Sequence, residues 1–168
     1  MVVEGNPKFD CHKHAVMKKR EAYLFTFNKT CTRFFFESQG SMGAIKKMVE
    51  FTLIDGPNWN LAFGDRKGDS FDDEVISNNN DIPRVIQTIV NIVHHFSELY
   101  PSRKIFIEGV DRKRQRLYHS IISRHLEEIN DFFIVFGFNF ERRSKELFNP
   151  RMEYDAFLIE RNKVLLEK

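Results

Sequence analysis

The sequence predicts a single α+β domain with a mostly antiparallel sheet and two amphipathic helices, in the order β-β-β-β-α-β-α-β-β. Short aromatic runs come first, and two longer segments with apolar residues every three or four positions follow. A composition of 42% hydrophobic and 30% charged residues is typical of a globular protein. We expect residues 1–16 to form a loose lead-in and residues 17–168 to form the domain.

Four strand-like runs predict an antiparallel meander at the start of the domain. They cover residues 21–27, 32–37, 47–54 and 59–63. In the first run Tyr23, Phe25 and Phe27 alternate, which places them on one face of a strand. A short polar segment predicts a hairpin after this run, and an Asp-Gly-Pro-Asn turn separates the third run from the fourth.

The segment 64–80 predicts a long polar loop. It contains two glycines and a group of acidic residues, which are Asp65, Asp69, Asp72, Asp73 and Glu74. Their spacing is not that of a calcium-binding loop, so we interpret them as solvated charge.

Residues 82–96 carry the strongest helical pattern. Asn80 or Asp81 can cap this helix, and Pro83 suits its first turn, where a missing N–H costs nothing. A short apolar strand at 105–108 follows.

A second helix is predicted after that strand, with Asp111 as its cap. Its inward residues are expected to be Leu117, Ile121, Ile122, Leu126 and Ile129, and its outward residues Arg112, Lys113, Arg116 and Glu127. The apolar run 132–138 predicts a central strand, residues 140–151 predict an irregular segment, and residues 154–160 predict the last strand.

A basic strand-to-helix turn at residues 109–118 is the strongest candidate for a site. A strand that runs into a helix directs backbone N–H groups and the positive end of the helix dipole at one point, which favours an anion. Cations in that first turn oppose the dipole, at a cost of roughly 0.3–1 kcal/mol each, so they are either solvated or used on a ligand. The candidate binding residues are Arg112, Lys113, Arg114 and Arg116.

Tyr118 and His119 are the candidate catalytic residues, because both could perform acid–base work on a phosphodiester beside the arginines. A histidine without a chemical role is the alternative. We expect no metal site, since Cys11-His12-Lys13-His14 has no second cluster at a conventional spacing. No Gly-x-Ser-x-Gly, Walker or dinucleotide glycine motif occurs, which disfavours those hydrolase, nucleotide-triphosphate and NAD classes.

The formal net charge of +2 does not by itself predict a nucleic-acid or membrane partner. No apolar run approaches the roughly 20 residues that span a bilayer, and no secretory signal precedes the two cysteines. We therefore expect a cytoplasmic protein with reduced thiols and no membrane partner. A Phe-rich sheet with edge strands leaves a homodimer open.

Several segments together resemble an uncharacterised bacterial domain family. They are Asn-Leu-Ala-Phe-Gly-Asp at 60–65, Ser-Asn-Asn-Asn-Asp at 77–81, Ile-Glu-Gly at 107–109, Arg-Gln-Arg-Leu-Tyr at 114–118 and Tyr-Asp-Ala-Phe at 154–157. The resemblance covers residues 21–161 and implies no established activity.

The predicted element order is also similar to that of the GNAT-type N-acetyltransferase superfamily, and Leu117-Tyr118 resembles a Leu-Tyr pair on its last core helix. That resemblance implies acetyl-CoA as a cofactor. The superfamily's pyrophosphate loop is Gln/Arg-x-x-Gly-x-Gly/Ala, whereas residues 77–82 contain no glycine. Glycine is needed there because the backbone approaches the pyrophosphate closely.

Three functions remain open. The first is a non-enzymatic or regulatory module that binds an anionic partner, such as nucleic acid or protein, through the basic turn. The second is a degenerate GNAT-like acyltransferase that binds acetyl-CoA near the start of the helix at 82–96, with Tyr118 as a possible acid. The third is a metal-independent ribonuclease of the small-toxin kind that uses Arg114, Arg116, Tyr118 and His119.

Overall fold

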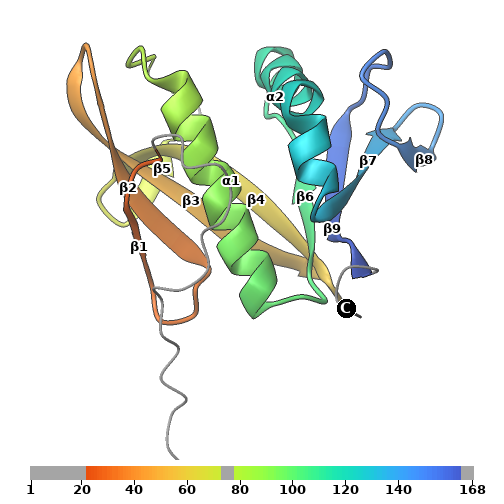
Figure 1. Ribbon diagram of the computed structural model, residues 1–168, viewed down its shortest axis with the longest axis horizontal. Helices are drawn as coiled ribbons and strands as arrows, with labels where there is room; N and C mark the ends of the chain where they lie inside the picture. Colours follow the sequence, from red (N-terminus) through yellow and green to blue (C-terminus); the bar gives the residue numbers. More distant parts are fainter. Residues whose placement is uncertain (1–21, 73–77, 164–168) are drawn as a thin grey trace, which may run out of the picture.

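The computed structural model describes residues 22–72 and 78–163 (Figure 1). Its strands are β1 (Phe25–Phe27), β2 (Arg33–Gly40), β3 (Gly43–Asp55), β4 (Asn58–Lys67), β5 (Ser70–Asp72), β6 (Lys104–Ile107), β7 (Phe133–Asn139), β8 (Ser144–Leu147) and β9 (Ala156–Arg161). Its helices are α1 (Ile82–Leu99) and α2 (Arg112–Asn130). The predicted α+β class and the order of its elements are confirmed, with β5 and β8 as additions. The lead-in predicted for residues 1–16 lies outside the described residues.

The sheet is mostly antiparallel and has the strand order β1-β2-β3-β4-β6-β9-β7-β8, with β5 paired to β4. The first four strands form the predicted meander. Strands β4 and β6 are parallel, and their pairing begins at Asn58↔Lys104 and ends at Asn60↔Phe106. Strand β4 continues beyond this pairing to Lys67, and β5 pairs with it only from Asp65 onward, so residues 61–64 lie between the two pairings. This end of the parallel pair is where the candidate site lies.

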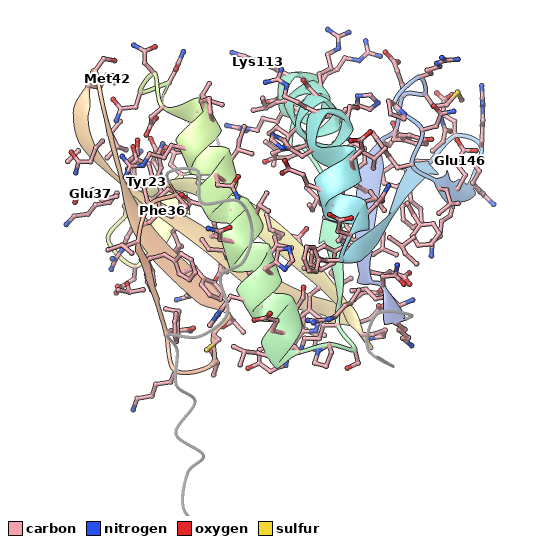
Figure 2. The ribbon with its side chains drawn as sticks, viewed as in Figure 1. Tyr23, Phe36, Glu37, Met42, Lys113 and Glu146 are labelled. Carbon is pink, nitrogen blue, oxygen red and sulfur yellow. The ribbon has the colours of Figure 1, made fainter. Side chains whose placement is uncertain are left out.

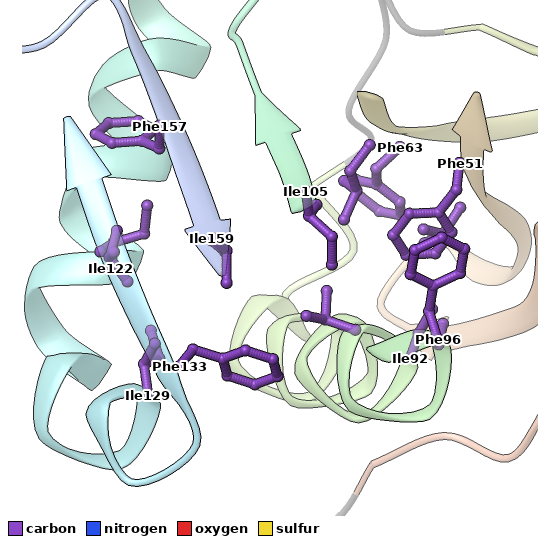
Figure 3. Packing of buried hydrophobic residues seen from close by; sticks show 14 of the residues in the cluster. Phe51, Phe63, Ile92, Phe96, Ile105, Ile122, Ile129, Phe133, Phe157 and Ile159 are labelled. Carbon is purple, nitrogen blue, oxygen red and sulfur yellow. The ribbon is translucent and has the colours of Figure 1, made fainter. Parts of the chain in front are cut away.

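Both helices cover one face of the sheet, α1 over β3 and β4 and α2 over β6, β9 and β7 (Figure 1). Phe96 of α1 stacks on Phe51 of β3 with ring centroids 3.8 Å apart. Ile129 of α2 lies beside Phe133 of β7 (Figure 3). Buried apolar side chains from both helices therefore belong to one core cluster.

Asp111 caps α2 as predicted, since its Oδ1 accepts a hydrogen bond from the backbone N–H of Arg114 at 2.8 Å. Asp81 precedes α1 but makes no side-chain cap bond. Its carboxylate instead accepts hydrogen bonds from Tyr23 Oη at 2.7 Å and Ser38 Oγ. The beginning of α1 is thereby attached to β2 and to the segment before β1.

Asn79 is fully buried and connects the start of α1 to the β2–β3 turn. Its Nδ2 donates to Ser38 Oγ at 3.0 Å and to the carbonyl oxygen of Gly43 at 2.9 Å. Its Oδ1 accepts from the backbone N–H of Met42 at 2.7 Å. We call this set of hydrogen bonds the Asn79 clamp; it joins the start of α1 to Ser38 and to the β2–β3 turn, in which Met42 is labelled in Figure 2.

The prediction of a long polar loop at residues 64–80 is wrong for residues 64–72. Strand β4 runs to Lys67, and β5 folds back onto it. Asp65, interpreted from the sequence as solvated, instead forms an ion pair with Lys47, a residue that is 2% exposed. A buried cation needs such a partner, which the local sequence does not reveal. Residues 73–77 lie outside the described part of the chain.

Three further predictions differ in detail. The run 132–138 becomes β7, which lies next to the edge strand β8, so β9 is the more interior of the two. The segment 140–151 is not wholly irregular, because it contains β8. Leu117 is half-buried, whereas Arg114 is buried.

A candidate anion-binding cleft between β4, β6 and α2

A polar cleft of about 420 Å³ opens where the pairing of β4 with β6 ends. In sheets with parallel strands, ligands commonly bind beyond the carboxyl ends of those strands. The described walls of the cleft are residues 60–63 of β4, residues 108–110, Arg114 and Tyr118. Part of the predicted basic turn and part of β4 thus meet at one place.

Arg114 is the cation that the fold places inside this cleft. The residue is 7% exposed, although it lies in the first turn of a surface helix. Its guanidinium pairs with Asp111 Oδ2 at 3.4 Å, and the Asp111 side chain is 54% exposed. A long ion pair to a solvated carboxylate compensates poorly for the desolvation of a guanidinium. Arg114 therefore has capacity for a further anionic partner.

The other three cations of the predicted site are separated from Arg114. Arg112, Lys113 and Arg116 are all exposed. Lys113 lies at the outer end of α2 (Figure 2). Helical geometry explains the separation, because residue 114 falls on the same face as residues 118 and 122, which pack toward the sheet, while the other three positions face solvent.

Gly109 and Gln115 fix the position of the turn beneath the cleft. The Gln115 Oε1 accepts from the backbone N–H of Gly109 at 2.8 Å, and its Nε2 donates to the carbonyl oxygen of Tyr154 at 2.9 Å. A Cβ on Gly109 would lie 2.5 Å from the backbone nitrogen of Gln115. Only glycine permits this approach of the strand to the helix, and the approach holds Arg114 against the cleft.

Tyr118 and His119 are adjacent in sequence but do not meet in the cleft. Tyr118 lines the cleft, while His119 Nε2 lies 2.7 Å from the carbonyl oxygen of Met152. The His119 ring also packs near Phe148, with centroids 5.2 Å apart. The structure therefore places His119 outside the cleft and leaves Tyr118 as the predicted catalytic candidate in the cleft.

An apolar cavity of about 100 Å³ adjoins the cleft, and both are lined by Leu61, Phe63 and Tyr118. The cavity lies between α1 and α2 over the sheet, and its other described walls are aliphatic or aromatic apart from His94. Burial, together with the nearby Arg161, lowers the pKa of His94 to about 4. Its ring is therefore neutral at pH 7.

We predict that His94 makes folding acid-sensitive. The unfolded chain binds a proton at His94 near pH 6.5, whereas the folded protein does so only near a pKa of about 4. Stability is therefore lost as pH falls through this window, by ~1–2 kcal/mol after allowance for partial solvent screening. Urea unfolding of wild type and His94→Phe at pH 7 and pH 4.5 measures the effect. The wild type should lose more stability than the variant, and an equal loss would contradict the prediction.

Asn60 and Glu108 line the cleft, although no sequence pattern indicated a site at either residue. They lie in different resemblance segments, and only the parallel β4–β6 pairing brings them together. Cys11, His12 and His14 lie outside the described residues. Within the described ranges no group of three His, Cys, Asp or Glu side chains is arranged to hold a metal ion. The helices described here are not long and apolar enough to cross a bilayer.

The chain belongs to a family of unknown function, DUF6934, whose model matches residues 19–162. No curated protein and no solved structure matches it significantly. The resemblance to an uncharacterised domain family is thereby confirmed. The family description assigns no activity, so any function has to be inferred from the cleft and its residues.

Proposed function

We propose that this protein is a binding module for a small anionic ligand, which it holds in the β4–β6 cleft through Arg114. The observation that carries this proposal is a buried guanidinium that lines a polar cleft and that, within residues 22–72 and 78–163, forms one long ion pair, to an exposed carboxylate. In a pocket of low dielectric constant, a hydrogen bond to a charged group contributes about 1.5–3 kcal/mol. Backbone groups of the adjacent turn complete the polar wall.

The charge inside the cleft favours a small ligand over a polyanion. Glu108, an exposed residue, lines the same cleft as Arg114, so the described walls of the cleft carry one formal charge of each sign. A nucleic-acid groove instead presents an excess of cations along its length, and its affinity falls steeply with salt. The three exposed cations, Arg112, Lys113 and Arg116, lie outside the cleft and can attract an anion toward it without contacting it.

The exposed cations provide a direct test. We predict that the triple variant Arg112→Ala, Lys113→Ala, Arg116→Ala binds acetate and inorganic phosphate within about threefold of the wild type at 0.15 M salt, because exposed charges are screened over ~8 Å. Isothermal titration calorimetry measures both affinities. Loss of binding in the triple variant, with binding intact in Arg114→Met, would place the anion site on the exposed face of α2 and overturn the proposal.

The second candidate function is that of a GNAT-like acyltransferase with acetyl-CoA as its ligand. It is supported by the parallel β4–β6 pair and by Tyr118 in the cleft. Against it, Asp81 occupies the start of α1 and Asn79 is committed to its clamp, so neither supplies an open phosphate-binding loop. A thermal shift distinguishes the two, since acetyl-CoA at 100 times its Kd would add ~2.7 kcal/mol to stability. No shift at millimolar acetyl-CoA would remove this candidate.

The ribonuclease hypothesis has no comparable support. It requires Tyr118 and His119 to act on one phosphodiester with Arg114 and Arg116. These four side chains divide between the cleft, the Met152 carbonyl and the exposed face of α2. General acid–base pairs must reach the same reacting group, directly or through one water.

A further inference from the structure

We infer that the ligand is a linear amphiphile, a monocarboxylate whose head group binds Arg114 and whose alkyl chain enters the apolar cavity between α1 and α2. This inference rests on the proposed function and adds the chemical class of the ligand. Its basis is that two neighbouring spaces of opposite character share Leu61, Phe63 and Tyr118 as walls.

The polar end selects a head group with a single negative charge. Arg114 supplies one cation, and Glu108 on the same cleft disfavours a second negative charge. A carboxylate can accept two parallel hydrogen bonds from the planar guanidinium. Its single negative charge is then compensated by the single positive charge of Arg114. A doubly charged phosphate would place its second charge near Glu108, and the described walls of the cleft contain no second cation to compensate it.

The apolar end accepts hydrocarbon and little else. Tyr118 stands at the boundary of the two spaces, so its ring can contact the chain on one side while the cleft remains polar on the other. Val90 of α1 and Ile121 of α2 line the cavity and are half-buried, so the helices do not close over it completely. A cavity of about 100 Å³ admits a short alkyl chain, given that apolar cavities of about 150 Å³ bind benzene.

Affinity should therefore rise with chain length until the cavity is filled. Each buried methylene contributes about fourfold in affinity, which corresponds to ~0.8 kcal/mol. We expect hexanoate to bind at least tenfold more tightly than acetate, and hexanol, which lacks the charge, to bind at least tenfold more weakly than hexanoate. Calorimetric titration of acetate, butyrate, hexanoate and hexanol into the wild-type protein measures these ratios.

Substitutions in the cavity and in the cleft test the binding of the alkyl chain and of the carboxylate head group separately. Val90→Phe fills the cavity from α1 and should abolish the preference for hexanoate while acetate binds as in the wild type. Ile121→Phe fills the same cavity from α2 and serves if Val90→Phe does not fold. Arg114→Met should weaken acetate binding about 10- to 100-fold and reduce hexanoate to the affinity of hexanol.

The outcomes distinguish this inference from the proposed function. If hexanoate binds no more tightly than acetate while acetate still depends on Arg114, the alkyl-chain inference is overturned and the anion site stands. Equal affinities for hexanol and hexanoate would overturn the role of the carboxylate head. If neither acetate nor hexanoate binds, both the inference and the proposed function fail.

Discussion

Arg114→Met is expected to lower acetate affinity by about 10- to 100-fold and to leave the ligand-free protein as stable as the wild type, or ~1–2 kcal/mol more stable. The loss of affinity follows from removing a charge-assisted hydrogen bond worth about 1.5–3 kcal/mol. The gain in stability follows because Arg114 is buried and its ion pair with Asp111 is long, at 3.4 Å. Replacing such a charge by an apolar side chain of similar length removes its desolvation cost. Calorimetric titration and urea unfolding measure the two effects.

Arg116→Met is the matched control, because Arg116 lies in the same helix but is exposed. This substitution should change the affinity for acetate by less than about threefold. It should change the free energy of unfolding by less than ~0.5 kcal/mol. A purely structural Arg114 would give the opposite pattern. Its removal would lower stability by several kcal/mol, as breaking a needed buried pair does, and that result would count against a binding role.

Gly40→Ala is expected to destabilise the fold by ~3 kcal/mol or more. A Cβ at position 40 would overlap the carbonyl oxygen of Asn79 and the Asn79 side chain. Relief requires the β2–β3 turn to move away from α1, which breaks the Asn79 clamp and leaves the buried Asn79 amide without its partners in that turn. Overpacking costs about 1–3 kcal/mol, and unsatisfied buried polar groups add to that.

Met42→Ala is the control for that substitution, since Met42 lies in the same turn with 64% of its surface exposed. It should shift the free energy of unfolding by less than ~0.5 kcal/mol, because only its backbone N–H takes part in the clamp. Denaturant unfolding of both variants measures the difference. A Gly40→Ala protein as stable as Met42→Ala would show that the turn tolerates a side chain and that the clamp is not rigid.

Local patterns predicted most elements of this fold. Alternating apolar residues predicted β1, β3 and β4, and a dense aromatic run predicted β2. Apolar spacing of three and four residues predicted α1 and α2, and Asp111 was correctly predicted as the cap of α2. These signals are readable because they depend on neighbours within one element. Strand β5 was missed because its pairing with β4 supplies the stability that its short polar sequence lacks.

The cleft itself depends on contacts that are distant in sequence. It exists because β6 pairs in parallel with β4 over three residues only, and no local pattern encodes where that pairing stops. The burial of Arg114 had a readable signal, since it lies four residues before Tyr118 and eight before Ile122, on one helical face. The residue type instead predicts an exposed position for Arg114, because arginines are seldom buried. The sequence therefore indicated the correct turn but grouped four cations that the fold separates.

The most direct test of an anion site in the β4–β6 cleft is a backbone amide NMR titration with acetate at 0.15 M salt. We predict saturable shift changes at residues 60–63, 108–110 and 114, all of which belong to the cleft walls. Arg114→Met should remove these changes. Shifts confined to the exposed positions 112, 113 and 116, or no saturable shift anywhere, would contradict the binding function proposed for the cleft.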